Sequence, residues 1–304
     1  MPGSYKEFFL AIDAAIRKVP TRRPPNKLLY HYTRASTAVK ILQDHALWAS
    51  DVRCMNDTRE LQHGVTLICE QADALRSRKG EHELFEDALK HPNFTSVSVF
   101  AASLSEQSDV LSQWRAYGED GAGYAIGFDA KLIHQLQPAE WDKPLAATLQ
   151  KVVYRQATQT RIAANVTSVL FDALKQRVSR RGDPDNLAIV SHALSWVVYL
   201  FASGCKSSAF REEAEWRLVA TALSPTMWST PGDVWAPKAS FHVGRYGLTP
   251  YLTLPFSNDA VREVMMGPKI PEEFGRASLV ALLSNSKLKE WQKIATPHAK
   301  ASYR

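Results

Sequence analysis

Two carboxylates, Glu213 and Glu215, stand one residue apart, and Arg217 follows at the same interval. Because side chains alternate along a strand, an extended segment places these three on one face and Trp216 and Leu218 on the other. Neighbouring carboxylates are unfavourable unless a cation, a base or a substrate uses them. The pattern therefore indicates either a catalytic pair of carboxylates or a solvated edge strand with a Glu215–Arg217 ion pair.

A histidine inside a short apolar strand is a second feature. His31 stands within residues 28–33, ahead of a predicted helix over 36–44 that Ser36 would cap. An imidazole there could bond a ligand hydroxyl, or it could be a core histidine whose hydrogen bonds are satisfied.

Two further polar groups suit either a site or ordinary structure. Asn56, Asp57 and Glu60 could contribute to a site, or could cap the helix predicted from Arg59 to about residue 77. Ser103 and Ser105 share one face of a predicted strand over 97–105, where small residues also suit a half-buried strand.

Several well-known chemistries have no motif in this sequence. The zinc-protease HExxH, the phosphate-binding loop and the GxSxG nucleophile motif are all missing. Gly118, Gly121 and Gly123 precede a strand instead of joining a strand to a helix, so they predict a tight turn and not a dinucleotide fingerprint.

The elements that must position these residues are short and irregularly spaced. Strands are predicted over 28–33, 47–50, 97–105, 124–128, 152–154, 213–220, 251–254 and 261–266, and helices over 5–19, 36–44, 59–77 and 109–117, with two more in 158–203. A helical insert among short strands favours an α+β fold over a doubly wound α/β fold.

Composition narrows the class of protein. The 304 residues are 45% hydrophobic and 22% charged, as in a globular chain, and the net charge of +6 favours anionic partners. Three cysteines without metal-type spacing, the lack of a secretory leader and the lack of an apolar run near membrane length predict a cytoplasmic protein without a membrane partner. Basic residues in loops that look exposed are Arg76, Arg78, Lys79, Arg177, Arg180 and Arg181.

The order of these groups resembles an uncharacterised bacterial family. It is a domain of unknown function found in many genomes and sometimes near phage-defence genes. The resemblance runs from about Leu28 to Pro268. Its motifs are His31 between two tyrosines, Asn56-Asp57 with Glu60, Ser103-x-Ser105, Trp114-x-x-Tyr117 and Glu213-x-Glu215-Trp216-Arg217.

The same order is similar, more weakly, to the ADP-ribosyltransferase superfamily. That resemblance implies a split β-sheet core with flanking helices and a helical insert at about 156–205. It also implies NAD as the substrate, with His31 on the adenosine ribose and Ser103 and Ser105 supporting the pocket. Thr33 belongs to the same cofactor-binding set, and Tyr32 or Tyr117 would stack on nicotinamide.

In the same resemblance Glu215 is the catalytic carboxylate on the nicotinamide ribose, and Glu213 assists the acceptor. Breaking the nicotinamide–ribose bond creates an oxocarbenium-like transition state, which a carboxylate stabilises without a metal. The acceptor would be nucleic acid or a protein.

The expected protein is therefore an ADP-ribosyltransferase or NAD glycohydrolase that serves as a toxin or phage-defence effector, with an antitoxin or defence-system partner. Two alternatives stay open. One is an inactive domain of this fold that senses a nucleotide or binds a partner, and the other is a metal-dependent nuclease using His31, Asp57, Glu60 and Glu215. The expected organisation is a helix and linker over 1–26, the main domain over 27–275 and a tail over 276–304.

Overall fold

The computed structural model describes residues 23–54, 58–91, 97–136, 138–139, 147–175, 177–178, 184–223, 239–244 and 247–301. The helix expected over 5–19 lies outside these residues, as do Asn56, Asp57, Arg180 and Arg181. Helix α3 includes Glu60, but its side chain is also outside what the structure describes.

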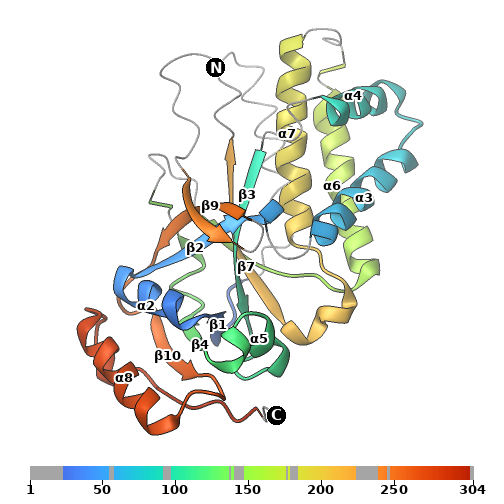
Figure 1. The fold of residues 1–304 in the computed structure, drawn as a ribbon. Coiled ribbons are helices and arrows are strands. Elements are labelled where there is room, and N and C mark those ends of the chain that lie inside the picture. Colours follow the sequence, from blue (N-terminus) through green and yellow to red (C-terminus); the bar gives the residue numbers. More distant parts are fainter. Residues whose placement is uncertain are drawn as a thin grey trace.

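The strands form one antiparallel sheet (Figure 1). They are β1 (Leu28–Thr33), β2 (Ala46–Asp51), β3 (Val97–Ser105), β4 (Tyr124–Asp129), β5 (Gln135–Leu136), β6 (Ala147–Lys151), β7 (Glu215–Leu223), β8 (Ser240–Gly244), β9 (Gly247–Pro255) and β10 (Val261–Met266). The order is β10-β4-β1-β3-β2-β9-β8, and β7 pairs with the other edge of β3, followed by β6 and β5. An antiparallel sheet combined with helices confirms the α+β class.

Strand β3 has a different kind of neighbour on each edge. β7 follows β3 over its full length, from Val97 to Ser105. On the opposite edge β1 pairs with β3 only at Ser105, and β2 pairs only with Ala101 and Phe100. β1 and β2 therefore separate along this edge, and Ser103 lies in the gap between them.

The helices fall into two groups. α2 (Ala35–Asp44) and α8 (Glu272–Asn285) pack against the sheet, and α5 (Leu111–Ala116) lies beside β1. α3 (Thr58–Ala74), α4 (Lys79–Lys90), α6 (Gln156–Lys175) and α7 (Pro184–Ser203) form a bundle beside the sheet, seen at the upper right of Figure 1. The two helices expected within 158–203 are thus confirmed as α6 and α7.

Alternation in the central strands sends side chains into two cores. Phe100 and Leu104 of β3 join Trp216 and Leu218 of β7 in the core under α2 and α8. On the other face Val99, Ala101 and Val219 pack near α7. Trp216 and Leu218 share one face of β7, as predicted, and this face lies in the core, so the opposite face is available for Glu215 and Arg217.

The glycine-rich segment is a tight turn, as predicted. Gly121 has a φ of 87°, and the amide of Gly123 donates to the carbonyl of Gly118 at 2.8 Å. A side chain on Gly123 would meet the carbonyl oxygen of Thr33 at 2.2 Å. The turn therefore sets the close approach of β4 to the end of β1.

Several sequence expectations are wrong in detail. Ser36 does not cap α2, whose N-cap is Arg34. The segment expected as a charged loop over 78–81 is instead the start of α4, with Arg78 as its N-cap and Lys79 as its first residue. Arg78 pairs with Asp172 at 3.0 Å across the bundle. Arg177, expected in an exposed loop, is buried.

Three strand expectations also change. The strand expected at 152–154 lies earlier in the chain, as β6, and the sequence analysis did not predict β5 and β8.

The C-terminal segment crosses the boundary expected at 275, since α8 spans it and Ala295 and His298 bridge to β10. Among the described residues no helix has the length and apolar character that crossing a membrane requires.

Candidate functional site

A cavity of about 290 Å³ opens where β1 and β2 separate along β3. This volume is at the lower end of the range for small-molecule sites. The lining is aromatic on the β1 and β2 side and charged on the β7 side. Its polar and aromatic members include Tyr30, His31, Tyr32, Trp48, Ser50, Ser103, Tyr117, Lys206, Glu213, Glu215, Arg217 and His242.

Glu215, the first residue of β7, lies buried at this cavity with an ion pair on each oxygen. Its Oε1 accepts from Nε of Arg217 at 2.7 Å, and its Oε2 accepts from Nη2 of Arg217 and Nζ of Lys206, both at 3.0 Å. The hydroxyl of Ser103 also donates to this carboxylate. These four donors fill the roughly four lone-pair positions of a carboxylate.

The protonation state of Glu215 follows from this environment. Burial by itself raises the pKa of a carboxyl, but the charges of Arg217 and Lys206 and the hydrogen bonds of Arg217 and Ser103 outweigh it and lower the pKa of Glu215 to about 2. Glu215 is therefore a fixed negative charge near neutral pH.

Glu213 reaches the same cation from outside the strand. The short helix Ser208–Glu213 ends there, and Ala214 has left-handed backbone angles, with φ 43° and ψ 48°. The expectation that strand alternation puts Glu213 and Glu215 on one face is therefore wrong. They meet instead at Nζ of Lys206, which lies 2.5 Å from Oε2 of Glu213.

The turn at Ala214 is held by β3. The hydroxyl of Ser105 donates to the carbonyl of Glu213 at 2.6 Å, and the amide of Glu106 donates to the carbonyl of Ala214 at 3.1 Å. A left-handed alanine persists only where such neighbours hold it. Ser105 thus positions Glu213, and it is not among the residues that line the cavity.

His31 lines the cavity from β1. Its Nδ1 lies 2.9 Å from the carbonyl oxygen of Ser103, in the gap between β1 and β2. Because a carbonyl oxygen only accepts, Nδ1 carries the proton there. Burial lowers the pKa of His31, against the opposing effect of the Ser103 bond, so the ring is neutral near pH 7. Nε2 is then an acceptor, and it has no hydrogen-bond partner among the residues that the structure describes.

The other expected cofactor-binding residues are placed differently. Tyr32 lines the cavity, but its hydroxyl donates to the carbonyl of Gln107 at 3.0 Å and accepts from the amide of Val110 at 3.1 Å. Tyr117 lines the cavity and is partly exposed. Thr33 is buried and does not line it.

Sequence reasoning missed three cavity residues. Lys206 gave no signal because a lone lysine after a helix looks like a surface residue. Trp48 and His242 lie far apart in sequence, yet their rings are 5.8 Å apart, and Nε2 of His242 lies 3.3 Å from the hydroxyl of Ser50. Only the pairing of β2 with β9, and of β9 with β8, brings them together.

Of the four residues expected for a metal-dependent nuclease, the structure describes the side chains of His31 and Glu215, which line the same cavity. Asp57 and the side chain of Glu60 lie outside what the structure describes. Glu215 already binds two cationic side chains, which take the lone pairs that a metal would need.

Residues 113–218 match a family described as a protein of unknown function (DUF2971), which confirms the expectation of an uncharacterised family. The matched region contains most of α5, the glycine turn, the helices α6 and α7, and both carboxylates. Neither the curated proteins nor the solved structures contain a match to this chain.

Replacing Glu215 tests the structural importance of its ion pairs. Glu215→Gln leaves the buried side chains of Lys206 and Arg217 without their shared anion, so it should reduce the free energy of unfolding by about 3–5 kcal/mol. Urea denaturation followed by circular dichroism measures this. Glu212→Gln, an exposed neighbour in the preceding short helix, should leave stability within about 0.5 kcal/mol. Equal free energies of unfolding for the wild type and both variants would show that the ion pairs of Glu215 do not stabilise the fold.

Stability should also depend on acid pH through Glu215. Because its folded-state pKa of about 2 lies below the ordinary value of 4.5, the unfolded chain takes up the proton first. The stabilisation is present in full above about pH 4.5 and is lost as pH falls toward 2. Unfolding free energies measured from pH 6 to pH 3 should fall less steeply in Glu215→Gln than in wild type. Parallel curves would show that Arg217, Lys206 and Ser103 do not lower the pKa of Glu215.

Proposed function

We propose that this chain cleaves the nicotinamide–ribose bond of NAD in the cavity between β1 and β2, as an ADP-ribosyltransferase or NAD glycohydrolase. The observation that carries the proposal is the convergence of His31 from β1 with Glu213 and Glu215 on one cavity. The separation of β1 from β2 fits the split sheet expected for this superfamily, and we include that core in the proposal.

His31 suits the ribose of NAD. With Nδ1 fixed on the carbonyl of Ser103, Nε2 faces a ligand as an acceptor for a ribose hydroxyl. A strand-borne ring held by a second bond keeps its orientation before the ligand arrives, which lowers the entropic cost of binding. The rings of Tyr32 and Tyr117 line the same cavity and offer surfaces for the nicotinamide.

The carboxylates divide the chemistry between them. When the glycosidic bond breaks, nicotinamide leaves with the bonding electrons and C1′ of the ribose gains positive charge. Water or an acceptor nucleophile then bonds to C1′ and loses a proton. We assign the carboxylate nearest this charge to Glu213, because the oxygens of Glu215 are already filled by Arg217, Lys206 and Ser103. Glu215 then acts as a positioning residue, whereas the resemblance implied that Glu215 is the catalytic carboxylate and that Glu213 assists the acceptor.

The acceptor, if the reaction is a transfer, is proposed to be nucleic acid or an acidic protein. The net charge of +6 supports an anionic partner. A role as a toxin or phage-defence effector, with an antitoxin or defence-system partner, fits an enzyme that consumes NAD and is part of the same proposal.

A second candidate is a nucleotide-sensing domain without catalysis. Glu213 and Glu215 share the cavity with Lys206 and Arg217, so the formal charges of these four side chains sum to zero. A neutral set offers less stabilisation to a cationic transition state than a lone carboxylate does. Such a site would bind NAD and leave it intact.

Replacing Glu213 tests the chemical assignment. Glu213→Gln keeps the shape of the side chain and removes its charge, so nicotinamide release should fall on the order of 10²–10³-fold. Lys206 keeps Glu215 as its partner, so the variant should still fold, which a thermal melt checks. Release is measured by chromatography of nicotinamide after incubation with NAD. Glu212→Gln, from the same short helix but exposed, is the matched control and should keep wild-type activity.

The outcomes separate the two candidates. Release that Glu213→Gln leaves unchanged would refute the role of this carboxylate. No release from the wild type, together with NAD binding in isothermal titration calorimetry, would favour the sensor. If the wild type neither releases nicotinamide nor binds NAD, both candidate functions are overturned.

Replacing His31 tests ligand binding. His31→Ala removes one acceptor for a ribose hydroxyl, so the dissociation constant of NAD should rise about tenfold, as expected for one hydrogen bond of about 1.4 kcal/mol. Calorimetric titration gives the constant and a thermal melt checks folding. A variant that fails to fold would instead identify His31 as a core histidine.

A further inference from the structure

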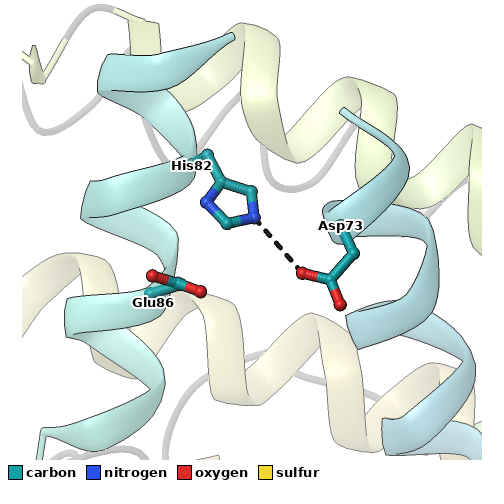
Figure 2. A group of neighbouring side chains, drawn as sticks. All are labelled: Asp73, His82 and Glu86. Atoms are coloured by element: carbon teal, nitrogen blue, oxygen red, sulfur yellow. Dashed lines mark hydrogen bonds and ion pairs between the residues drawn. The ribbon is translucent and has the colours of Figure 1, made fainter. Parts of the chain in front are cut away.

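A second group of ligating side chains lies in the helical bundle, and none of its members lines the cavity (Figure 2). Asp73 comes from the last turn of α3, and His82 and Glu86 come from α4. One ligand atom from each lies within 4.8 Å of the other two. Among the residues that the structure describes, no other group of three histidine, cysteine or acidic side chains comes this close together.

The helices fix the directions of these side chains. His82 and Glu86 are four residues apart, so they share one face of α4. Figure 2 shows the imidazole of His82 turned toward Asp73, with the carboxylate of Glu86 one turn along the same helix. Packing holds α4 in place, because Phe85 contacts Phe171 at 5.5 Å between ring centroids.

The contact between His82 and Asp73 is longer than an ordinary hydrogen bond. Nε2 of His82 lies 3.4 Å from Oδ1 of Asp73, longer than the usual 2.7–3.2 Å of an N–H···O bond. The His82 side chain is only 9% exposed, whereas that of Asp73 is 57% exposed. A buried imidazole is therefore aimed at a carboxylate that is mostly exposed to solvent.

We propose that Asp73, His82 and Glu86 bind one Zn²⁺ ion, with water completing the coordination. One imidazole nitrogen and two carboxylate oxygens are donors that Zn²⁺ accepts, and a nitrogen donor disfavours Mg²⁺ and Ca²⁺. Ligand atoms about 2.1 Å from a tetrahedral ion lie about 3.4 Å apart. The longer separations in the group would have to close by side-chain rotation, which the exposed Asp73 and the partly exposed Glu86 allow.

The neighbouring cations permit this ion. Arg76 pairs with Asp73 at 3.2 Å, but both side chains are more than half exposed, and such pairs contribute little. Arg78 is engaged by Asp172 at 3.0 Å and by Glu81 at 3.6 Å. The ion would tie the end of α3 to α4.

The test uses the full chain, stripped with a chelator and titrated with zinc chloride in a calorimeter. We expect one Zn²⁺ ion to bind per chain at this site, and we expect saturating zinc to raise the melting temperature by about 5 °C. Asp73→Asn and His82→Ala should each weaken binding at least about 100-fold, since even outer-shell partners cost 10–100-fold. Arg76→Gln should tighten it, because it removes a competing cation.

The zinc titration does not depend on NAD cleavage, so its result and that of the NAD experiments can fail independently. His134→Ala removes a histidine from the turn after β4 and should leave zinc affinity unchanged. Because Asp73 is exposed, Asp73→Asn should fold even if His82→Ala does not. Zinc binding in Asp73→Asn equal to wild type, or no binding by the wild type, would overturn the proposal.

Discussion

The buried carboxylate of Glu215 is the constraint on which the rest of this structure depends. A charge withdrawn from water is tolerated only when paired and hydrogen-bonded, so Arg217 and Lys206 must lie beside it. Arg217 in turn donates from Nη1 to the carbonyl of Ser203 at 2.6 Å, at the end of α7. One carboxylate thus connects the sheet to the helical bundle.

The same network explains why the cavity has its shape. The backbone of Lys206 is held by the side chain of Gln159, whose Nε2 donates to its carbonyl at 2.9 Å, and Gln159 belongs to α6. The bundle therefore supplies the cation that draws Glu213 and Glu215 together, while the sheet supplies His31 across the gap. Preorganised charges of this kind need no rearrangement when a ligand enters, which is what electrostatic catalysis requires.

Much of this could be predicted from the sequence, and the failures have physical causes. Alternation placed Trp216 and Leu218 in the core because a strand has only two faces. The same rule failed at Glu213, because Ala214 takes a left-handed conformation that an alanine does not signal. That conformation depends on hydrogen bonds from Ser105 and Glu106, more than 100 residues earlier.

Residues brought together by distant strand pairings were out of reach. Trp48 and His242 meet only through β9, and a single sequence carries no record of that pairing. Lys206 was missed for a related reason, since its burial depends on α6 and β7 together. Local patterns therefore located the strands that carry the site and the Glu215–Arg217 ion pair, and did not locate Lys206, the second cation.

The most direct test of this account is a crystal structure of the protein soaked with NAD or a non-cleavable analogue. The account predicts density in the cavity between β1 and β2, with a ribose hydroxyl within hydrogen-bond distance of Nε2 of His31 and the nicotinamide ribose beside Glu213. Well-ordered ligand bound elsewhere on the molecule, with this cavity empty, would contradict it.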